Sequence, residues 1–153
     1  MIKVSVFSEE KAWLKKFKKT DLFFKKICKA FPKKYQFSKK KVSLSLLLSN
    51  NKNIKKLNKN FRNKNKSTDI LSFPFDKKIK ISKYMYLGDI IISYNYIDKP
   101  KTQDLESFKH KVVKIFIHGY LHLLGFNHLK NKDYFKMLRE ENYIYKHVKS
   151  KIN

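Results

Sequence analysis

Three histidines near the C-terminal end of the chain restrict its fold more than any other feature. His118, His122 and His128 follow the spacing H-x3-H-x5-H, with Gly125 between the second and the third. Residues four apart share one face of a helix, so His118 and His122 can direct both imidazoles toward one point. Gly125 can then adopt the left-handed conformation that ends a helix, and this turn would bring His128 back to the same point. The motif therefore predicts a long helix followed at once by a reversing turn.

Three neutral imidazoles that converge in this way suit a zinc ion, which prefers nitrogen ligands in tetrahedral geometry. A site with three protein ligands leaves the fourth position for water, which is typical of a catalytic zinc. We therefore predict one Zn²⁺ per chain, held by His118, His122 and His128. A pair of helical histidines can also arise by coincidence, and the isolated His110 and His147 are interpreted as ordinary histidines.

The remaining hydrophobic pattern predicts an α+β fold, with a small mixed β-sheet of about four strands and helices packed against it. The segment 87–93 is continuously apolar at Ile90, Ile91 and Ile92 and is expected to be a central strand, while 104–124 is the long helix that carries two metal-ligand histidines. We treat residues 1–153 as a single domain, because the chain has no repeat and no linker-like segment. The other predicted strands are 2–7, 42–48 and 70–73, and the other predicted helices are 9–31, 50–61 and 132–148.

The chain is strongly basic, with 37 basic and 12 acidic residues and a net charge of +25. Such a charge favours a polyanionic partner, and nucleic acid is the first candidate. Nearly all the basic residues are lysine, and only Arg62 and Arg139 are arginine. Because lysine, asparagine, isoleucine and tyrosine are also abundant, part of the charge has an alternative origin in the drift of an AT-rich genome.

Composition also bears on location. No apolar run approaches the length needed to cross a membrane, and the N-terminus lacks the apolar core of a signal peptide. The single cysteine, Cys28, cannot form an internal disulfide and is interpreted as a small buried hydrophobe. A soluble cytoplasmic protein without membrane contact is expected.

The histidine spacing resembles that of zinc proteases, which carry HExxHxxGxxH. In those enzymes the glutamate after the first histidine is the general base that takes a proton from water. Gly119 stands at this position and has no side chain to accept a proton. The residues therefore predict the ligand geometry without the peptidase chemistry, and we expect Gly119 to leave space close to the metal.

Three blocks of sequence resemble the YbeY family of bacterial endoribonucleases, also called rRNA maturation factors. The blocks are LNKNFRNKNKSTDILSFPF at 57–75, LGDIIIS at 87–93 and HGYLHLLGFNH at 118–128. Glu141 after Met137 is similar to the M-x-x-x-E pattern of that family. The resemblance covers about half of the chain, and the three blocks in this order are much more specific than the histidines alone.

The resemblance implies a single-strand-specific, zinc-dependent endoribonuclease that acts in ribosomal RNA processing, in the 3′ maturation of small-subunit rRNA and in ribosome quality control. It also implies that the three histidines are the metal ligands and that Arg62 is the catalytic arginine. The planar guanidinium of Arg62 suits bidentate contact with a phosphate. Lys111 and Lys114 precede His118 on the same helix face and are candidates for substrate binding. The expected partners are single-stranded RNA and the small ribosomal subunit, and protein partners cannot be named.

The chain departs from the family pattern at several positions. Asn127 stands where an aspartate is common, so its role beside the ligand His128 is expected to be that of a hydrogen-bonding neighbour without charge. Asn63 replaces a glycine and can adopt a left-handed turn. Lys114 occupies the place of a further family histidine.

Four polar residues in the resembling blocks have alternative roles. Asp69 and Asp89 can orient substrate or a ligand, or make only turn and strand-end hydrogen bonds. Thr68 and Ser72 fit structural roles better than catalytic ones. Two rival functions remain open from the sequence: a metallohydrolase that acts on another substrate, which Gly119 disfavours, and a ribosome- or RNA-binding assembly factor whose metal only supports the fold.

Overall fold

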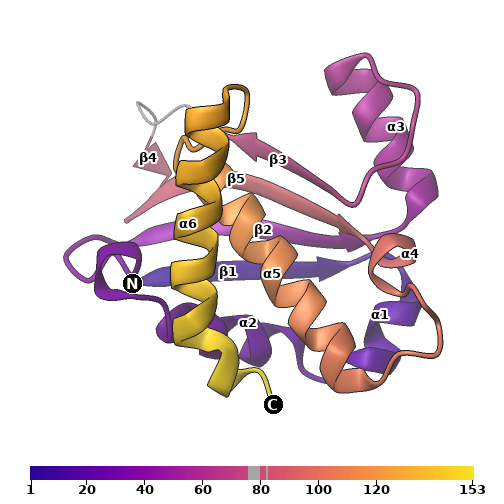
Figure 1. The fold of residues 1–153 in the computed structure, drawn as a ribbon, viewed down its shortest axis with the longest axis horizontal. Coiled ribbons are helices and arrows are strands. Elements are labelled where there is room, and N and C mark those ends of the chain that lie inside the picture. Colours follow the sequence, from indigo (N-terminus) through magenta and orange to yellow (C-terminus); the bar gives the residue numbers. More distant parts are fainter. Residues whose placement is uncertain (76–79, 82) are drawn as a thin grey trace.

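The computed structural model describes residues 1–75, 80–81 and 83–153, and Figure 1 shows their arrangement. The predicted α+β class is confirmed, with strands and helices mixed along the chain. The strands are β1 (Ile2–Ser8), β2 (Val42–Ser49), β3 (Ile70–Pro74), β4 (Lys80–Ile81) and β5 (Tyr84–Ser93). The helices are α1 (Lys11–Lys16), α2 (Thr20–Lys29), α3 (Asn51–Arg62), α4 (Tyr94–Ile97), α5 (Leu105–Leu123) and α6 (Asn131–Val148), with short 3₁₀ turns at Lys33–Tyr35 and Lys149–Lys151.

The sheet is mixed, and its strand order is β1-β2-β5-β3, with the two-residue β4 paired to β5. β1, β2 and β5 run parallel, whereas β3 runs antiparallel to β5. β5 therefore lies inside the sheet between β2 and β3, as the continuous apolar run Ile90, Ile91 and Ile92 predicts. Helices pack on both faces of this strand, so successive side chains are buried on opposite sides.

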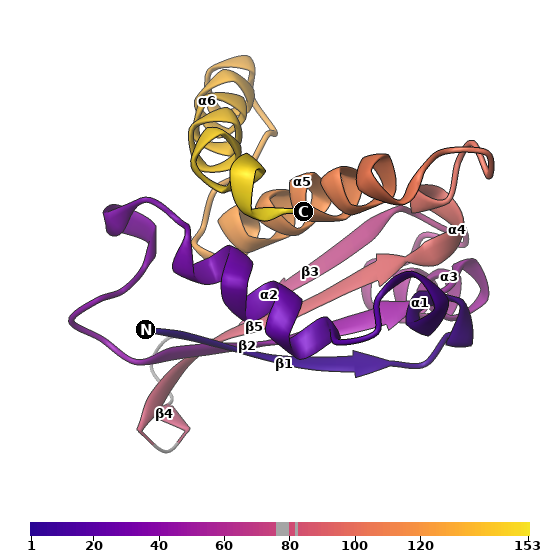
Figure 2. The ribbon, with the colours of Figure 1, turned by 90° about the horizontal axis from the view of Figure 1, so that it is seen from below.

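The two faces of the sheet carry different helices. Side chains alternate along a strand, so Ile90 and Ile92 of β5 face one side and Ile91 faces the other. Ile90 and Ile92 belong to the large core, together with side chains of α2 and α5. Ile91 belongs to a small separate cluster with Ile54 of α3 and Leu71. Figure 2 shows α5 and α6 lying over one face of the sheet.

The predicted helix at 9–31 is wrong in one respect, because the chain forms two helices there, α1 and α2. Phe17 is extended (φ −126°, ψ 111°) and ends α1. This conformation buries its ring near Phe23 and Phe108, at centroid distances of 4.8 and 5.9 Å. A continuous helix would also bring Lys15, Lys16, Lys18 and Lys19 together at three- and four-residue spacing, where like charges destabilise a helix.

The long helix α5 begins and ends with side-chain and backbone caps. The carboxylate of Asp104 accepts a hydrogen bond from the backbone N–H of Ser107 at 2.6 Å, which satisfies one of the free donors of the first turn. α5 contributes Phe116 and Tyr120 to the core, and the Tyr120 hydroxyl donates to the carbonyl of Tyr35 at 2.9 Å. In the described part of the chain, no helix is both long enough and apolar enough to cross a bilayer.

Candidate metal centre and cleft

The three histidines of the motif meet at one point. His118 and His122 lie on the last turns of α5, His128 lies on the following loop, and one nitrogen of each lies within 4.8 Å of the other two. The Nε2 atoms of His118 and His122 are 3.0 Å apart. A tetrahedral zinc site places its nitrogens about 3.3 Å apart, because each lies about 2.05 Å from the metal. The spacing of the His118 and His122 Nε2 atoms is thus close to that of a metal site.

Gly125 is the residue that turns His128 toward the helix. Its φ is +97°, a backbone conformation that favours glycine. The N–H of Gly125 donates to the carbonyl of His122 at 3.0 Å, and the N–H of Phe126 donates to that of Leu121 at 3.1 Å. These two hydrogen bonds form a Schellman motif, which satisfies the free carbonyls of the last turn. The chain reverses there, and the ring centroid of His128 lies 5.0 Å from that of His122.

Hydrogen bonds to the Nδ1 atoms orient two of the three rings. The Nδ1 of His122 lies 2.9 Å from the carbonyl oxygen of Phe126. A carbonyl only accepts, so His122 carries its proton on Nδ1 and leaves a lone pair on Nε2. The Nδ1 of His118 lies 2.5 Å from Glu141 Oε1, and a carboxylate holds the ring proton there in the same way.

The two Nε2 lone pairs therefore face each other at 3.0 Å, an arrangement that is repulsive unless a cation lies nearby. Burial, followed by the neighbouring His118, lowers the pKa of His122, which keeps this ring neutral and able to coordinate. Imidazoles oriented by a carboxylate and a carbonyl match the donor set of zinc and similar transition metals. The residues present fit a divalent metal ion on these grounds.

A cleft of about 680 Å³ lies over the histidines. Arg62, the last residue of α3, lines the same cleft. Asn63 ends α3 in the left-handed conformation with φ 55°, as its place in the sequence predicts, and the chain leaves the helix toward β3. The other lining residues are Phe61, Thr68, Asp69, Ile70, Ser72, Phe73, Pro74, His118, His122, Gly125, Phe126, Asn127, His128 and Leu129.

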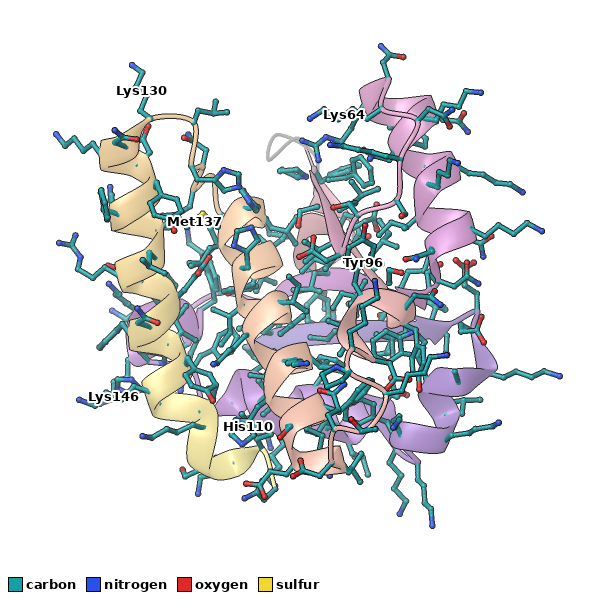
Figure 3. All side chains as sticks on the ribbon, turned by 45° about the vertical axis from the view of Figure 1, so that its right-hand side comes forward. Lys64, Tyr96, His110, Lys130, Met137 and Lys146 are labelled. Carbon is teal, nitrogen blue, oxygen red and sulfur yellow. The ribbon has the colours of Figure 1, made fainter. Side chains whose placement is uncertain are left out.

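The cleft is flanked by exposed basic residues. Figure 3 shows Lys64 and Lys130 at the same end of the molecule and His110 at the opposite end. Lys64 lies two residues after the cleft residue Arg62, and Lys130 directly follows the cleft residue Leu129. His110 Nδ1 lies 2.7 Å from the hydroxyl of Tyr145, so this histidine has its own hydrogen-bond partner away from the cleft. Lysines on both sides of a cleft that contains an arginine create a positive potential that suits a polyanion.

Lys111 and Lys114 are not among the described residues that line the cleft. The Lys111 ammonium donates to the carbonyl of Lys99, and the Lys114 ammonium lies 4.7 Å from the centre of the Tyr145 ring. Asn127 lines the cleft, but its Oδ1 accepts from the backbone of Leu129 at 3.3 Å. The sequence did not predict that Glu141 forms a hydrogen bond with His118. The M-x-x-x-E pattern had marked the position of Glu141 but not its role.

Gly119 does not leave space near the histidines, contrary to the expectation from the sequence. A Cβ at this position would lie 2.7 Å from Ile70 Cδ1 and 3.0 Å from Ser72 Oγ. The glycine therefore allows α5 to approach β3 closely, and its carbonyl lies 3.4 Å from the Ser72 hydroxyl. A glutamate would not fit here, which supports the exclusion of the zinc-protease arrangement.

Asp69 and Asp89, for which the sequence left two roles open, lie in different places in the structure. Asp69 Oδ1 accepts from the backbone of Ile70 at 2.8 Å and from the Thr68 hydroxyl at 3.2 Å, at the edge of the cleft. Asp89 lies on the other face of the sheet, with its Oδ1 2.5 Å from the Tyr86 hydroxyl. Cys28 is buried, and burial raises the pKa of its thiol, so it is unsuited to be a nucleophile.

The sequence is similar to that of a known protein family over most of its length. The family model described as Endoribonuclease YbeY matches residues 6–149. The chain belongs to the YbeY endoribonuclease family. The family membership that the three sequence blocks indicated is thereby confirmed.

The similarity to individual members of the family covers most of the chain. Endoribonuclease YbeY of Pelagibacter ubique is 60% identical over 152 residues, which are 99% of each chain. Endoribonuclease YbeY of Buchnera aphidicola is 43% identical over 76% of this chain and 81% of its own. The solution structure of TM1509 from Thermotoga maritima aligns over 99% of this chain and 91% of its own, with a TM-score of 0.54 and 20% identity, and supports the fold alone.

Proposed function

We propose that this chain is a zinc-dependent endoribonuclease specific for single-stranded RNA. Membership of the family supports an RNA-cleaving role in ribosomal RNA processing. We further propose that the role includes 3′ maturation of small-subunit rRNA and ribosome quality control, in the cytoplasm, with residues 1–153 acting as one domain. The observation that carries the proposal is that Arg62 and the three histidines line one cleft.

In this proposal each residue has a defined task. His118, His122 and His128 hold one divalent ion, and Glu141 and the Phe126 carbonyl keep His118 and His122 in the coordinating tautomer. The bound ion supplies Lewis acidity toward a phosphate oxygen. Arg62 contacts the same phosphate and stabilises the negative charge that develops on its oxygens.

The surrounding charge and the cleft residues define the rest of the binding site. Exposed lysines such as Lys64 and Lys130 hold flanking phosphates, so binding weakens as salt rises. Duplex RNA is expected to resist, because its phosphates are fixed in a stiff helix that does not enter a cleft of this size.

The test is cleavage of an end-labelled single-stranded RNA by purified protein, with and without chelator and after zinc is restored. We expect cleavage that requires the metal, falls with salt and is absent on duplex RNA and on casein. His122→Ala should remove both the metal and the activity, and Arg62→Lys should lower cleavage by at least about tenfold with the metal retained, because a point charge cannot replace a bidentate fork.

The rival roles predict different results. If the protein binds RNA and zinc but wild type and His122→Ala are equally inactive, also when small ribosomal subunits are supplied, the assembly-factor alternative is favoured. Hydrolysis of casein that disappears with His118→Ala would refute the assignment to RNA. Cleavage of RNA that persists in chelator and in His118→Ala would indicate a contaminating nuclease.

A further inference from the structure

A second cavity lies on the face of the sheet that carries α3, on the other side from α5. Its volume is about 600 Å³, which is within the range of pockets that hold small organic ligands. Phe61 and Phe73 line both this cavity and the histidine cleft. The two spaces are therefore neighbours that share a wall. The other lining residues are Phe7, Ser45, Leu47, Leu57, Asp89, Ile90 and Ile91.

Two aromatic rings of this cavity are open to solvent. Phe61 is 69% exposed and Phe7 is 59% exposed. The ring of Phe61 meets that of Phe73 edge to face at 5.6 Å, so it is held in position although it is exposed. Exposed rings on a sheet face are platforms on which nucleobases stack, and this stacking is largely independent of base identity.

The charge of the cavity differs from that of the whole chain. The net charge is +25, but among the described residues that line the cavity there is no lysine or arginine, and the single ionisable side chain is Asp89. A phosphate would be repelled by this carboxylate and would find no cation. An uncharged planar ring would bury apolar surface there, and its N–H groups could donate to Asp89 or to Ser45.

The sequence places the two kinds of contact next to each other. Phe61 lines both cavities, and Arg62, the next residue, lines the histidine cleft alone. An RNA strand whose phosphate lies at Arg62 can thus place the attached or adjacent base against Phe61. The Tyr86 hydroxyl lies 2.5 Å from Asp89 Oδ1 and 2.7 Å from Ser45 Oγ, which fixes the polar wall that the base would meet.

We propose that this cavity is a nucleobase-binding subsite, which receives one unpaired base of the RNA strand whose backbone lies in the histidine cleft. The inference rests on the proposed ribonuclease function and adds a site that positions the strand. It also gives a reason for single-strand preference, because a base paired in a duplex cannot leave its stack to enter a side cavity.

The test is an abasic scan of a single-stranded oligoribonucleotide that the wild-type protein cleaves. One nucleotide at a time is replaced by a ribose without a base, and the dissociation constant and the cleavage rate are measured. We expect one position near the cleavage site at which loss of the base weakens binding by about tenfold, the size expected for one stacked base. Loss of the base elsewhere should have a much smaller effect.

Variants connect that position to the cavity. Phe7→Ala and Phe61→Ala should weaken binding of the intact strand, and in these variants the loss of the sensitive base should cost little more, since both changes remove the same contact. The matched control is Phe135→Ala on α6, an aromatic residue that is 65% exposed and lines neither cavity. Phe135→Ala should leave the abasic pattern unchanged.

The outcomes separate the two proposals. If the wild-type protein cleaves the intact strand in a metal-dependent way but no abasic position interacts with Phe7→Ala or Phe61→Ala, the subsite is refuted while the ribonuclease function stands. That result would leave the cavity to an apolar segment of a protein partner. If the wild-type protein neither binds nor cleaves single-stranded RNA, the proposed function fails, and the subsite fails with it.

Discussion

The two faces of the sheet differ in how much apolar surface they bury. The face under α2 and α5 is closed by the large aromatic core, in which Trp13, Phe24 and Phe116 are fully buried. The opposite face is covered by α3, where the buried cluster contains only Ile54, Leu71 and Ile91 among the described residues. Burial of apolar area provides most of the stability of a fold, so the first face stabilises the domain. The second face leaves apolar side chains exposed, among them Phe7 and Phe61.

The candidate metal centre lies at the edge where these two faces meet. His118 and His122 are held by α5, whose other side chains fill the core, whereas Arg62 ends α3 on the less covered face. The candidate ligand histidines and Arg62, the proposed phosphate-binding residue, thus line one cleft. This arrangement fits the need of a metal site for preorganised ligands and of a nuclease for an open path to a long substrate.

The largest expected effect concerns the packing of the two faces. Phe116 is fully buried, and its ring lies 5.0 Å from that of Phe24, so Phe116→Ala should lower the free energy of unfolding by about 3–5 kcal/mol. Leu57 is half-buried at the wall of the open cavity. Leu57→Ala should lower it by only about 1 kcal/mol, because no closed cavity is created. Urea unfolding of both variants measures the difference, and equal losses would refute the division between the faces.

The second prediction separates two neighbouring glutamates of α6. Glu141 forms a hydrogen bond with His118, and Glu140 accepts a hydrogen bond from the Tyr35 hydroxyl. Glu141→Ala should weaken metal binding by about 10- to 100-fold, because the imidazole loses the group that orients it. Glu140→Ala is the matched control and should keep the metal affinity of the wild type. Competition with a chelator measures both, and a similar loss in the two variants would show that the effect comes from α6 as a whole.

Partial rescue sharpens that test. Glu141→Gln keeps an oxygen that can accept the hydrogen bond from His118 Nδ1–H but removes the charge. It should therefore bind the metal more tightly than Glu141→Ala and more weakly than the wild type. If Glu141→Gln matched Glu141→Ala, the carboxylate charge alone would account for the effect.

The third prediction addresses the contact between α5 and the sheet. The Cβ of Gly119→Ala would lie 2.7 Å from Ile70 Cδ1, so α5 or the Ile70 side chain must move. We expect a loss of about 1–2 kcal/mol, somewhat reduced by the better helix propensity of alanine. Urea unfolding tests this, and a gain in stability would show that the helix and the sheet are packed less closely there than the structure indicates.

Several elements could be predicted from the sequence because their signals are local. The spacing of His118 and His122 and the place of Gly125 depend on helix geometry and on the glycine conformation alone, and the structure has both. The continuous apolar run of Ile90, Ile91 and Ile92 likewise identified the inner strand from a local signal. The family resemblance then placed Arg62 and the histidines in one site, and the structure brings them to one cleft.

Other features could not be predicted because they depend on contacts between distant segments. The extended Phe17 splits the helix predicted at 9–31 because its ring packs beside Phe108, which lies far along the chain. The partner of His118 is Glu141 on another helix, and no periodicity reveals which carboxylate reaches a ring. The close contact of Gly119 with Ile70 likewise arises only once the helix lies on the sheet.

The smallest expected effect is a pH dependence of the free energy of unfolding that comes from Glu140 of α6. Glu140 lies 2.7 Å from the Lys34 ammonium and 2.5 Å from the Tyr35 hydroxyl. Burial alone raises the pKa of Glu140, but the hydrogen bonds from Lys34 and Tyr35 outweigh it and hold this pKa below its usual range. A carboxyl group with a lowered pKa in the folded state stabilises the fold above its unfolded pKa of about 4.3, and this contribution is lost as the pH falls through the folded value.

The expected contribution of Glu140 is about 1 kcal/mol, since Lys34 is half-exposed and water screens the pair. Urea unfolding of wild type and Glu140→Gln at pH 6 and at a series of lower pH values measures it. The two proteins should differ by this amount at pH 6, and the difference should shrink as the pH falls and the wild-type carboxyl becomes protonated. Lys55→Gln on α3, an exposed residue of the opposite face, is the matched removal of a surface charge and should show no such convergence. A constant difference between wild type and Glu140→Gln over the whole pH range would mean that the glutamate acts through packing and not through its charge.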